Sequence, residues 1–156
     1  MGSTERTILT RLQTNLQAID GTGSFNYDFS PADSVIIGSL HVGSAPRAPG
    51  IYIQPLRINS SRNAGRTLLR NYDREMTVQI DVFVPRTGEG TANAVLAATD
   101  AVSDVMRALE ADPTVNGVGR DVELDVTAYD GEQVNLPGYG IGVLQVFIEY
   151  AEQRGA

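Results

Sequence analysis

Two stretches of the chain carry apolar residues at helical spacing. From Thr4 to about Ile19 they recur every three or four residues, with arginine and glutamine between them. From Thr91 to Ala111, alanine, valine, leucine and methionine recur at the same intervals, and Asp112-Pro113 follows. This period predicts amphipathic helices with one buried stripe each. We expect the first helix to stop at Asp20-Gly21 and the second before the proline.

Other stretches alternate between apolar and polar residues, as a half-buried strand does. The clearest is Glu75–Val84, in which valine, isoleucine and methionine occupy every second position. Shorter or less regular strand candidates are Ser24–Phe29, Ser34–Ile37, Ile51–Pro55, Asp121–Thr127 and Gly140–Tyr150.

This order of elements predicts an α+β fold. Strands both precede and follow the second helix, and the last strands are close enough in sequence to form a hairpin. Both features favour a mixed or antiparallel sheet, with the two amphipathic helices packed on one of its faces. A chain of 156 residues without repeats or a linker fits a single domain, residues 1–156.

Residues 57–74 are polar and rich in arginine, and we expect them to form a long extended loop. Five of the twelve basic residues of the chain lie there, namely Arg57, Arg62, Arg66, Arg70 and Arg74. One interpretation is solvated loop charge. The other is a docking arm for an acidic partner or a neighbouring subunit, since long loops in compact domains are often functional.

The rest of the chain is acidic, with a net charge of −7. That charge disfavours general binding to nucleic acid or to anionic membranes. The chain has no cysteine, which excludes disulfides and thiolate metal sites, and no apolar run approaches bilayer length. Its start carries no apolar signal core, so we expect synthesis in the cytoplasm and no membrane partner.

Candidate catalytic and metal-binding residues are few. His41 is the only histidine, and no nucleophile-elbow pattern accompanies it, so we interpret it as a loop residue. Asp121, Glu123 and Asp125 alternate along a predicted strand and would share one face, where they could bind a hard cation. A calcium loop would need glycine after Asp125, where Val126 stands. We therefore expect an acidic sheet face, no metal site and no enzyme.

Two glycine clusters resemble phosphate-binding loops without completing the pattern. Gly88-Glu89-Gly90 precedes a helix but lacks a third glycine or a Lys-Ser/Thr pair, and the glutamate would repel an anion. Gly138–Gly142 leads into a strand, and we interpret it as a bulged start of that strand. We expect no cofactor.

The succession of elements resembles the tail terminator (tail completion) proteins of long-tailed bacteriophages. The resemblance covers nearly the whole chain and rests on the order of elements rather than on a diagnostic residue. The segments that carry it are Ile8–Leu12, Ala48–Ile53, Met76–Val84, Ala92–Leu109, Val122–Leu124 and Leu144–Tyr150.

The resemblance implies a structural protein of the virion tail or neck that forms a ring, expected to be a hexamer. Such a ring caps the tail tube, ends addition of the tube protein and faces the head-side connector or stopper protein, while DNA passes through its channel. Our hypothesis is that residues 57–74 reach the tube, and that carboxylates such as Asp121, Glu123 and Asp125 line the channel. The alternatives are another neck protein (a head-completion or stopper ring) and a small cation-binding enzyme that uses Asp121, Glu123 and His41.

Overall fold

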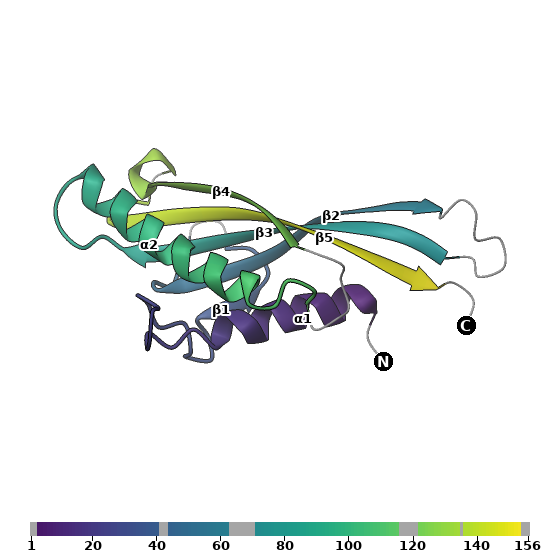
Figure 1. Ribbon diagram of the computed structural model, residues 1–156. Coiled ribbons are helices and arrows are strands. Elements are labelled where there is room, and N and C mark those ends of the chain that lie inside the picture. Colours follow the sequence, from purple (N-terminus) through teal and green to yellow (C-terminus); the bar gives the residue numbers. More distant parts are fainter. Residues whose placement is uncertain (1–2, 41–43, 63–70, 116–121, 135, 154–156) are drawn as a thin grey trace.

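The described part of the chain folds into two α-helices and one open, five-stranded mixed sheet, which confirms the predicted α+β class (Figure 1). The computed structural model describes residues 3–40, 44–62, 71–115, 122–134 and 136–153. The elements are α1 (Thr4–Gln17), β1 (Val35–Ile37), β2 (Gly50–Arg62), β3 (Asn71–Pro85), α2 (Thr91–Glu110), β4 (Val122–Asp130), the short 3-10 helix η1 (Gly131–Val134) and β5 (Tyr139–Gln153). The strand order is β1-β2-β3-β5-β4; β1 is parallel to β2 and all other neighbours are antiparallel.

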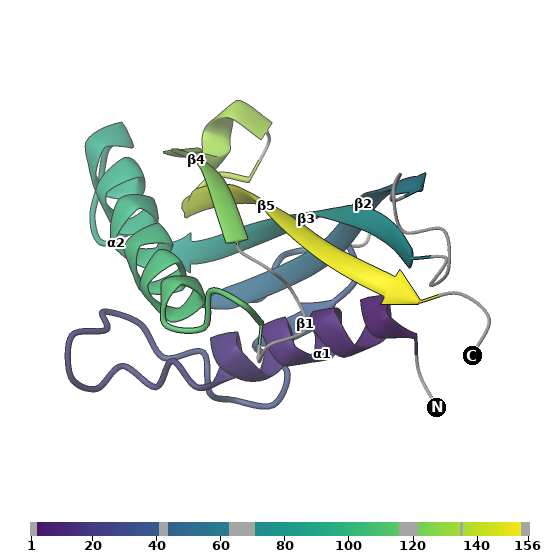
Figure 2. The same ribbon diagram turned by 45° about the vertical axis from the view of Figure 1, so that its right-hand side comes forward.

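Both α-helices lie against the same face of the sheet, as predicted (Figures 1 and 2). Helix α1 begins after Ser3, whose side chain accepts a hydrogen bond from the backbone N–H of Arg6 at 3.1 Å, a typical N-cap. Its apolar stripe, Ile8, Leu12 and Leu16, is fully buried against the sheet. Every second residue of β3 from Met76 to Val84 is also buried. The apolar stripe of the helix and the apolar face of the strand therefore form one core.

Helix α2 packs directly against β5 because two glycines of the strand leave room for it. A Cβ added at Gly140 would lie 2.3 Å from the carbonyl oxygen of Ala94, and one added at Gly142 would lie 2.2 Å from Cγ2 of Val102. The pairing of β5 with β3 runs from Asn71 to Pro85 without a register shift. The predicted bulge at Gly138–Gly142 is therefore wrong: the glycines at 140 and 142 serve helix packing.

The predicted strand at Ser24–Phe29 is also wrong. That segment forms turns, and its one strand-like contact is an isolated bridge between Asp20 and Asp28. The backbone N–H groups of Asn26 and Tyr27 instead donate to the fully buried carboxylate of Asp104, each at 2.8 Å to Oδ2. A side-chain acceptor on α2 thus replaces the strand partner that these donors would otherwise need.

The predicted loop at residues 57–74 is largely a β-hairpin. Strand β2 continues to Arg62 and β3 begins at Asn71, with Arg57 paired to Thr77 and Arg62 paired to Tyr72. Only residues 63–70 separate the strands, and they lie outside the described part of the chain. Polar residues hid these strand ends, because the sequence there lacks the alternation of a half-buried strand.

Candidate protein interface

The sheet has one face that α1 and α2 do not cover, which we call the open face. A polar row crosses it, because Gln54, Gln79, Gln145 and Asp125 are successive cross-strand partners on β2, β3, β5 and β4. The side-chain amides of Gln54 and Gln79 donate to the two carboxylate oxygens of Asp81, each at 2.9 Å. These two bonds hold the amides of Gln54 and Gln79 and the carboxylate of Asp81 in place on the open face.

Asp81 is the half-buried charge of the open face. Burial raises the pKa of Asp81 above its ordinary value, and the hydrogen bonds from Gln79 and Gln54 offset only part of this effect. The pKa of Tyr129, on β4, is raised by its own burial and by the charge of Asp81. Each carboxylate oxygen of Asp81 accepts a hydrogen bond from a glutamine, so the group is held in place as a structural element of the surface.

Negative charge dominates the open face. Among the residues whose side chains the structure describes, its charged groups are Arg57, Glu75, Asp81, Asp125 and Glu149, four carboxylates against one arginine. Of the three acidic residues singled out from sequence, Asp125 is exposed here and Glu123 belongs to the same strand, β4, while Asp121 lies outside the described residues. An acidic face of this kind repels polyanions.

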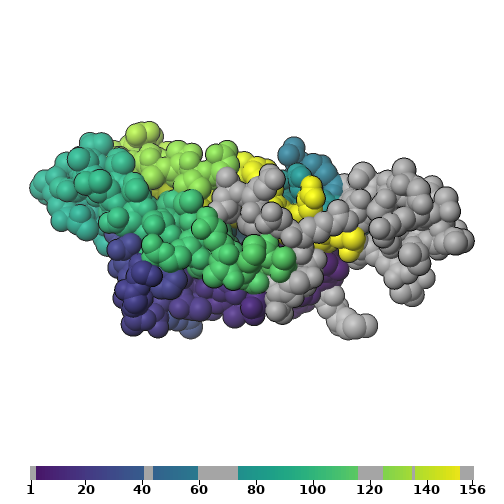
Figure 3. Space-filling view, viewed as in Figure 1, coloured from purple at the N-terminus to yellow at the C-terminus, as the bar shows by residue number. Residues whose placement is uncertain are grey.

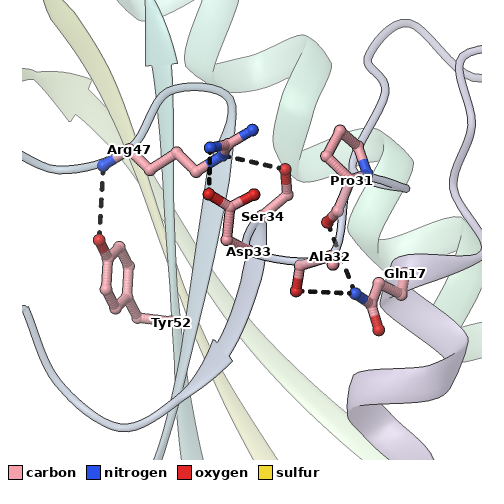
Figure 4. Close-up of polar contacts among 7 residues, drawn as sticks. All are labelled: Gln17, Pro31, Ala32, Asp33, Ser34, Arg47 and Tyr52. Atoms are coloured by element: carbon pink, nitrogen blue, oxygen red, sulfur yellow. Dashed lines mark hydrogen bonds and ion pairs between the residues drawn. The ribbon is translucent and has the colours of Figure 1, made fainter.

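One end of the open face is closed by a second, small apolar cluster. Tyr52 and Phe83 meet edge to face with ring centroids 5.5 Å apart, and Ile141 completes the buried part of the cluster. The segment 44–49 lies beside it: the backbone N–H of Arg47 donates to the hydroxyl of Tyr52, and its guanidinium binds Asp33 and Ser34 (Figure 4). These contacts fix the segment, so the polar row and the hairpin end remain as the accessible part of the face.

At the other end, the strands extend past the N-terminal end of α1 (Figures 1 and 2). We call residues 56–62 of β2 with residues 71–77 of β3 the arm. On the arm Leu56 and Ile58 are 49% and 47% exposed, and Arg57 is exposed between them. Arg62 ends β2, whereas Arg66 and Arg70 lie outside the described residues, so their docking role stays a prediction.

The fifth arginine, Arg74, faces α1 and fixes the base of the arm. Its guanidinium contacts Oε1 of Glu5 at 2.9 Å, and the hydroxyl of buried Tyr150 donates to the same oxygen at 2.6 Å. Burial alone would raise the pKa of Glu5, but the hydrogen bonds from Tyr150, the backbone and Arg74 outweigh it, so the pKa of Glu5 is lowered. Burial and the same carboxylate raise the pKa of Tyr150. Arg74 thus joins helix and arm within one chain.

The Glu5 carboxylate gives the arm a pH-dependent anchor. A carboxyl group whose pKa is lower in the folded state contributes stability above its unfolded pKa, and this contribution is lost as the pH falls through the folded pKa. Glu5→Gln should therefore lower the free energy of unfolding by about 1–2 kcal/mol at pH 7, the usual loss for charged hydrogen bonds. The deficit should shrink below about pH 4, near the unfolded pKa of glutamate. Urea unfolding at pH 7 and at pH 3 measures this loss of stability.

The control for this prediction is Glu149→Gln, which removes an exposed carboxylate of β5. It should change stability by less than about 0.5 kcal/mol at either pH, as surface substitutions usually do. An equal deficit for Glu5→Gln at pH 7 and pH 3 would contradict the anchoring role.

The residues proposed for a cation site do not come together in the described structure. Within residues 3–40, 44–62, 71–115, 122–134 and 136–153, no three histidine, aspartate or glutamate side chains are grouped to hold a metal ion. His41 lies outside these ranges, as does Asp121. None of the helices in the described part of the chain is long and apolar enough to span a bilayer.

Sequence reasoning missed two parts of this surface, the Gln54–Gln79–Asp81 network and the anchor at Glu5. The polar side of the strand Glu75–Val84 could have indicated the glutamine–aspartate network, since Gln79 and Asp81 alternate there with the apolar residues. The second joins α1 to the far ends of β3 and β5, and no local pattern points to it.

Comparison with known proteins adds no identity: no family model and no curated protein matches the sequence. The fold and the surface define the class, an α+β protein with an open mixed sheet, helices on one face and an acidic face opposite.

Proposed function

We propose that this chain is a structural protein of a long-tailed bacteriophage that caps the tail tube as a ring, like the tail terminators its order of elements resembles. The observation that carries the proposal is that the two faces of the sheet differ: helices pack on one face, and the other is acidic and accessible. In addition, the arm extends from one end of the sheet. A protein built to polymerise to a fixed number needs free surfaces of this kind.

The acidic open face suits the wall of a DNA channel. DNA carries one negative charge per about 1.7 Å of helix axis, and a wall that presents four carboxylates against one arginine would repel it. In this arrangement Asp81 and Asp125 line the channel and the helices lie outside. DNA then passes without binding.

The arginine-rich end of the arm suits a contact with the tube. Arg57 is exposed on the arm, and Arg66 and Arg70 fall in the connection between its two strands. Replacing Arg66 and Arg70 together with glutamate should abolish capping. The free energy of unfolding should change by no more than about 0.5 kcal/mol, because neither residue belongs to a stretch whose hydrophobic period predicts a buried helix or strand. The assay is the length of tubes assembled from the cognate tube protein with wild-type or variant chain, measured by electron microscopy.

Arg6→Glu is the control, since Arg6 is exposed on α1 and its reversal places a carboxylate near a helix N-terminus, where it is tolerated. Its capping should equal that of the wild type. Normal capping by the Arg66→Glu, Arg70→Glu variant would refute the tube contact. Wild-type chain that leaves tube length unchanged would refute the capping function itself.

A further inference from the structure

Two strand edges of the sheet are unpaired within the described residues, and they lie on opposite sides of it. Strand β4 ends the sheet on one side, as the last strand in the order. On the other side β1 pairs only with Ile51–Ile53, so β2 from Gln54 onward has no outer neighbour among the described strands. Unpaired edges present N–H and C=O groups that readily accept another strand. Pro55 and the bulge beside it restrict an added strand to Arg57–Arg62.

The two edges carry complementary charge on the open face. Arg57 pairs across the sheet with Thr77 and points to the open face, where it is exposed. Asp125 pairs with Gln145 on the same face and is exposed on β4. In one chain they are on strands separated by two others, about 14 Å apart at the strand spacing of 4.7–4.9 Å. They can meet only between chains.

The helix-side faces of the two edges are complementary as well. Ile58 pairs with Met76, which places it on the helix side of the sheet, yet it is 47% exposed because no described strand lies beside β2 at that level. Beside β4 on the same side is a groove of about 500 Å³ between that strand and α2. Its apolar lining consists of Val102, Met106, Val126 and Ala128. Figure 3 shows α2 and β4 adjoining on the surface.

We propose that Arg57–Arg62 of one copy of this chain adds as a strand to the β4 edge of the next copy. Arg57 then lies opposite Thr127 and diagonally beside Asp125, and Ile58 lies opposite Val126, which lines the groove of the same neighbour. Strand β4 runs opposite to β2 within the sheet, so continuing the sheet from copy to copy makes the new pair antiparallel. The inference rests on the proposed ring and names the surfaces that build it.

This contact joins two different surfaces, so it is heterologous and repeats until the ring closes. The edges lie at different levels along the strands: Asp125 is level with Gln54, while the free part of β2 begins at Arg57. Neighbouring copies are therefore staggered, which supplies the shear that a sheet needs to close on itself.

The absence of cysteine from the chain makes a cross-linking test specific. Arg57→Cys and Asp125→Cys chains, purified separately and mixed, should form a covalent dimer with a short thiol cross-linker, and neither should do so alone. The chain with both substitutions should give a ladder on a denaturing gel that ends at the ring number, since its own two cysteines would lie on strands about 14 Å apart, beyond the reach of a short cross-linker. Thr87→Cys, at an exposed turn, replaces Asp125→Cys in the control mixture and should not link.

Charge exchange tests the same pair without cysteine. Arg57→Asp or Asp125→Arg alone should weaken self-association by about tenfold or more, because each places like charges together. Both changes in one chain should restore association to within about threefold of the wild type, which a merely destabilising substitution would not do.

The possible results of these experiments distinguish failure of the proposed interface from failure of the proposed capping function. A ring seen by light scattering, with neither the cross-link nor the charge rescue, overturns this interface and leaves the capping proposal standing. Chains that cross-link and cap no tube support the interface and overturn the function. No association and no cross-link at any concentration overturn both.

Discussion

Replacing Gly140 with alanine should lower the free energy of unfolding by about 3 kcal/mol or more, the upper range for overpacking a close-packed interior. The added Cβ would lie 2.3 Å from the carbonyl oxygen of Ala94 and 3.1 Å from the backbone nitrogen of Ala98. Both atoms belong to the backbone of α2, so the helix must shift as a unit to accept one methyl group. The loss should appear as a lower midpoint of guanidinium unfolding with an unchanged slope.

Gly88→Ala is the matched control. A Cβ at Gly88 would meet only the side-chain end of Asn93, with the amide nitrogen 3.0 Å away, and that side chain can turn aside. Its cost should stay below about 1 kcal/mol, in the range of ordinary surface changes. Equal midpoints for Gly140→Ala and the wild type would contradict the close packing of α2 on β5.

Replacing Asp104 with asparagine should also cost about 3 kcal/mol, which is the loss expected when a buried charged acceptor is removed from its donors. The carboxylate is fully buried and accepts hydrogen bonds from the backbone and side-chain amides of Asn26 and from the backbone of Tyr27. Asparagine keeps the shape but turns an NH₂ group towards these donors. Denaturant unfolding measures the loss, and hydrogen exchange should show faster exchange at Asn26 and Tyr27.

The control is Asp100→Asn, one turn earlier on the same helix, where the side chain is exposed. The substitution removes the same charge from the same helix and leaves the backbone carbonyl of residue 100, which accepts from the Asn26 side chain, unchanged. Its effect should therefore stay within about 0.5 kcal/mol. If both variants unfolded at the same midpoint, the segment around Asn26 would owe its conformation to some other contact.

The helices and the buried strand stretches could be predicted from sequence because their periodicity reports burial directly. Helix α2 begins and ends almost where its pattern of alanine, valine and leucine does, at Thr91 and Glu110. Strand β3 was found by its alternation but extends to Asn71, beyond the buried part. Residues Arg57–Arg62 and Asn71–Glu75 lack a regular alternation of apolar and polar residues, so hydrophobic pattern could not show that they pair as strands.

The roles of single charged residues were harder to predict, because they depend on partners distant in sequence. Arg57 and Arg74 look alike in the sequence, yet the first is exposed on the arm and the second contacts Glu5 on α1. Asp104 occupies a position on the buried stripe of α2, where an acid is expected only if something donates to it. Its donors come from a segment that the sequence pattern assigned to a strand.

The capping function requires the chain to lie at the end of the tail tube in an assembled particle. A single Ser44→Cys substitution, at an exposed position on a chain without other cysteines, would carry a gold label for electron microscopy of intact phage. We expect label confined to the head-proximal end of the tail tube, in a ring that closes around the channel. Label at the portal, along the tube, or absent from the particles would contradict the capping function.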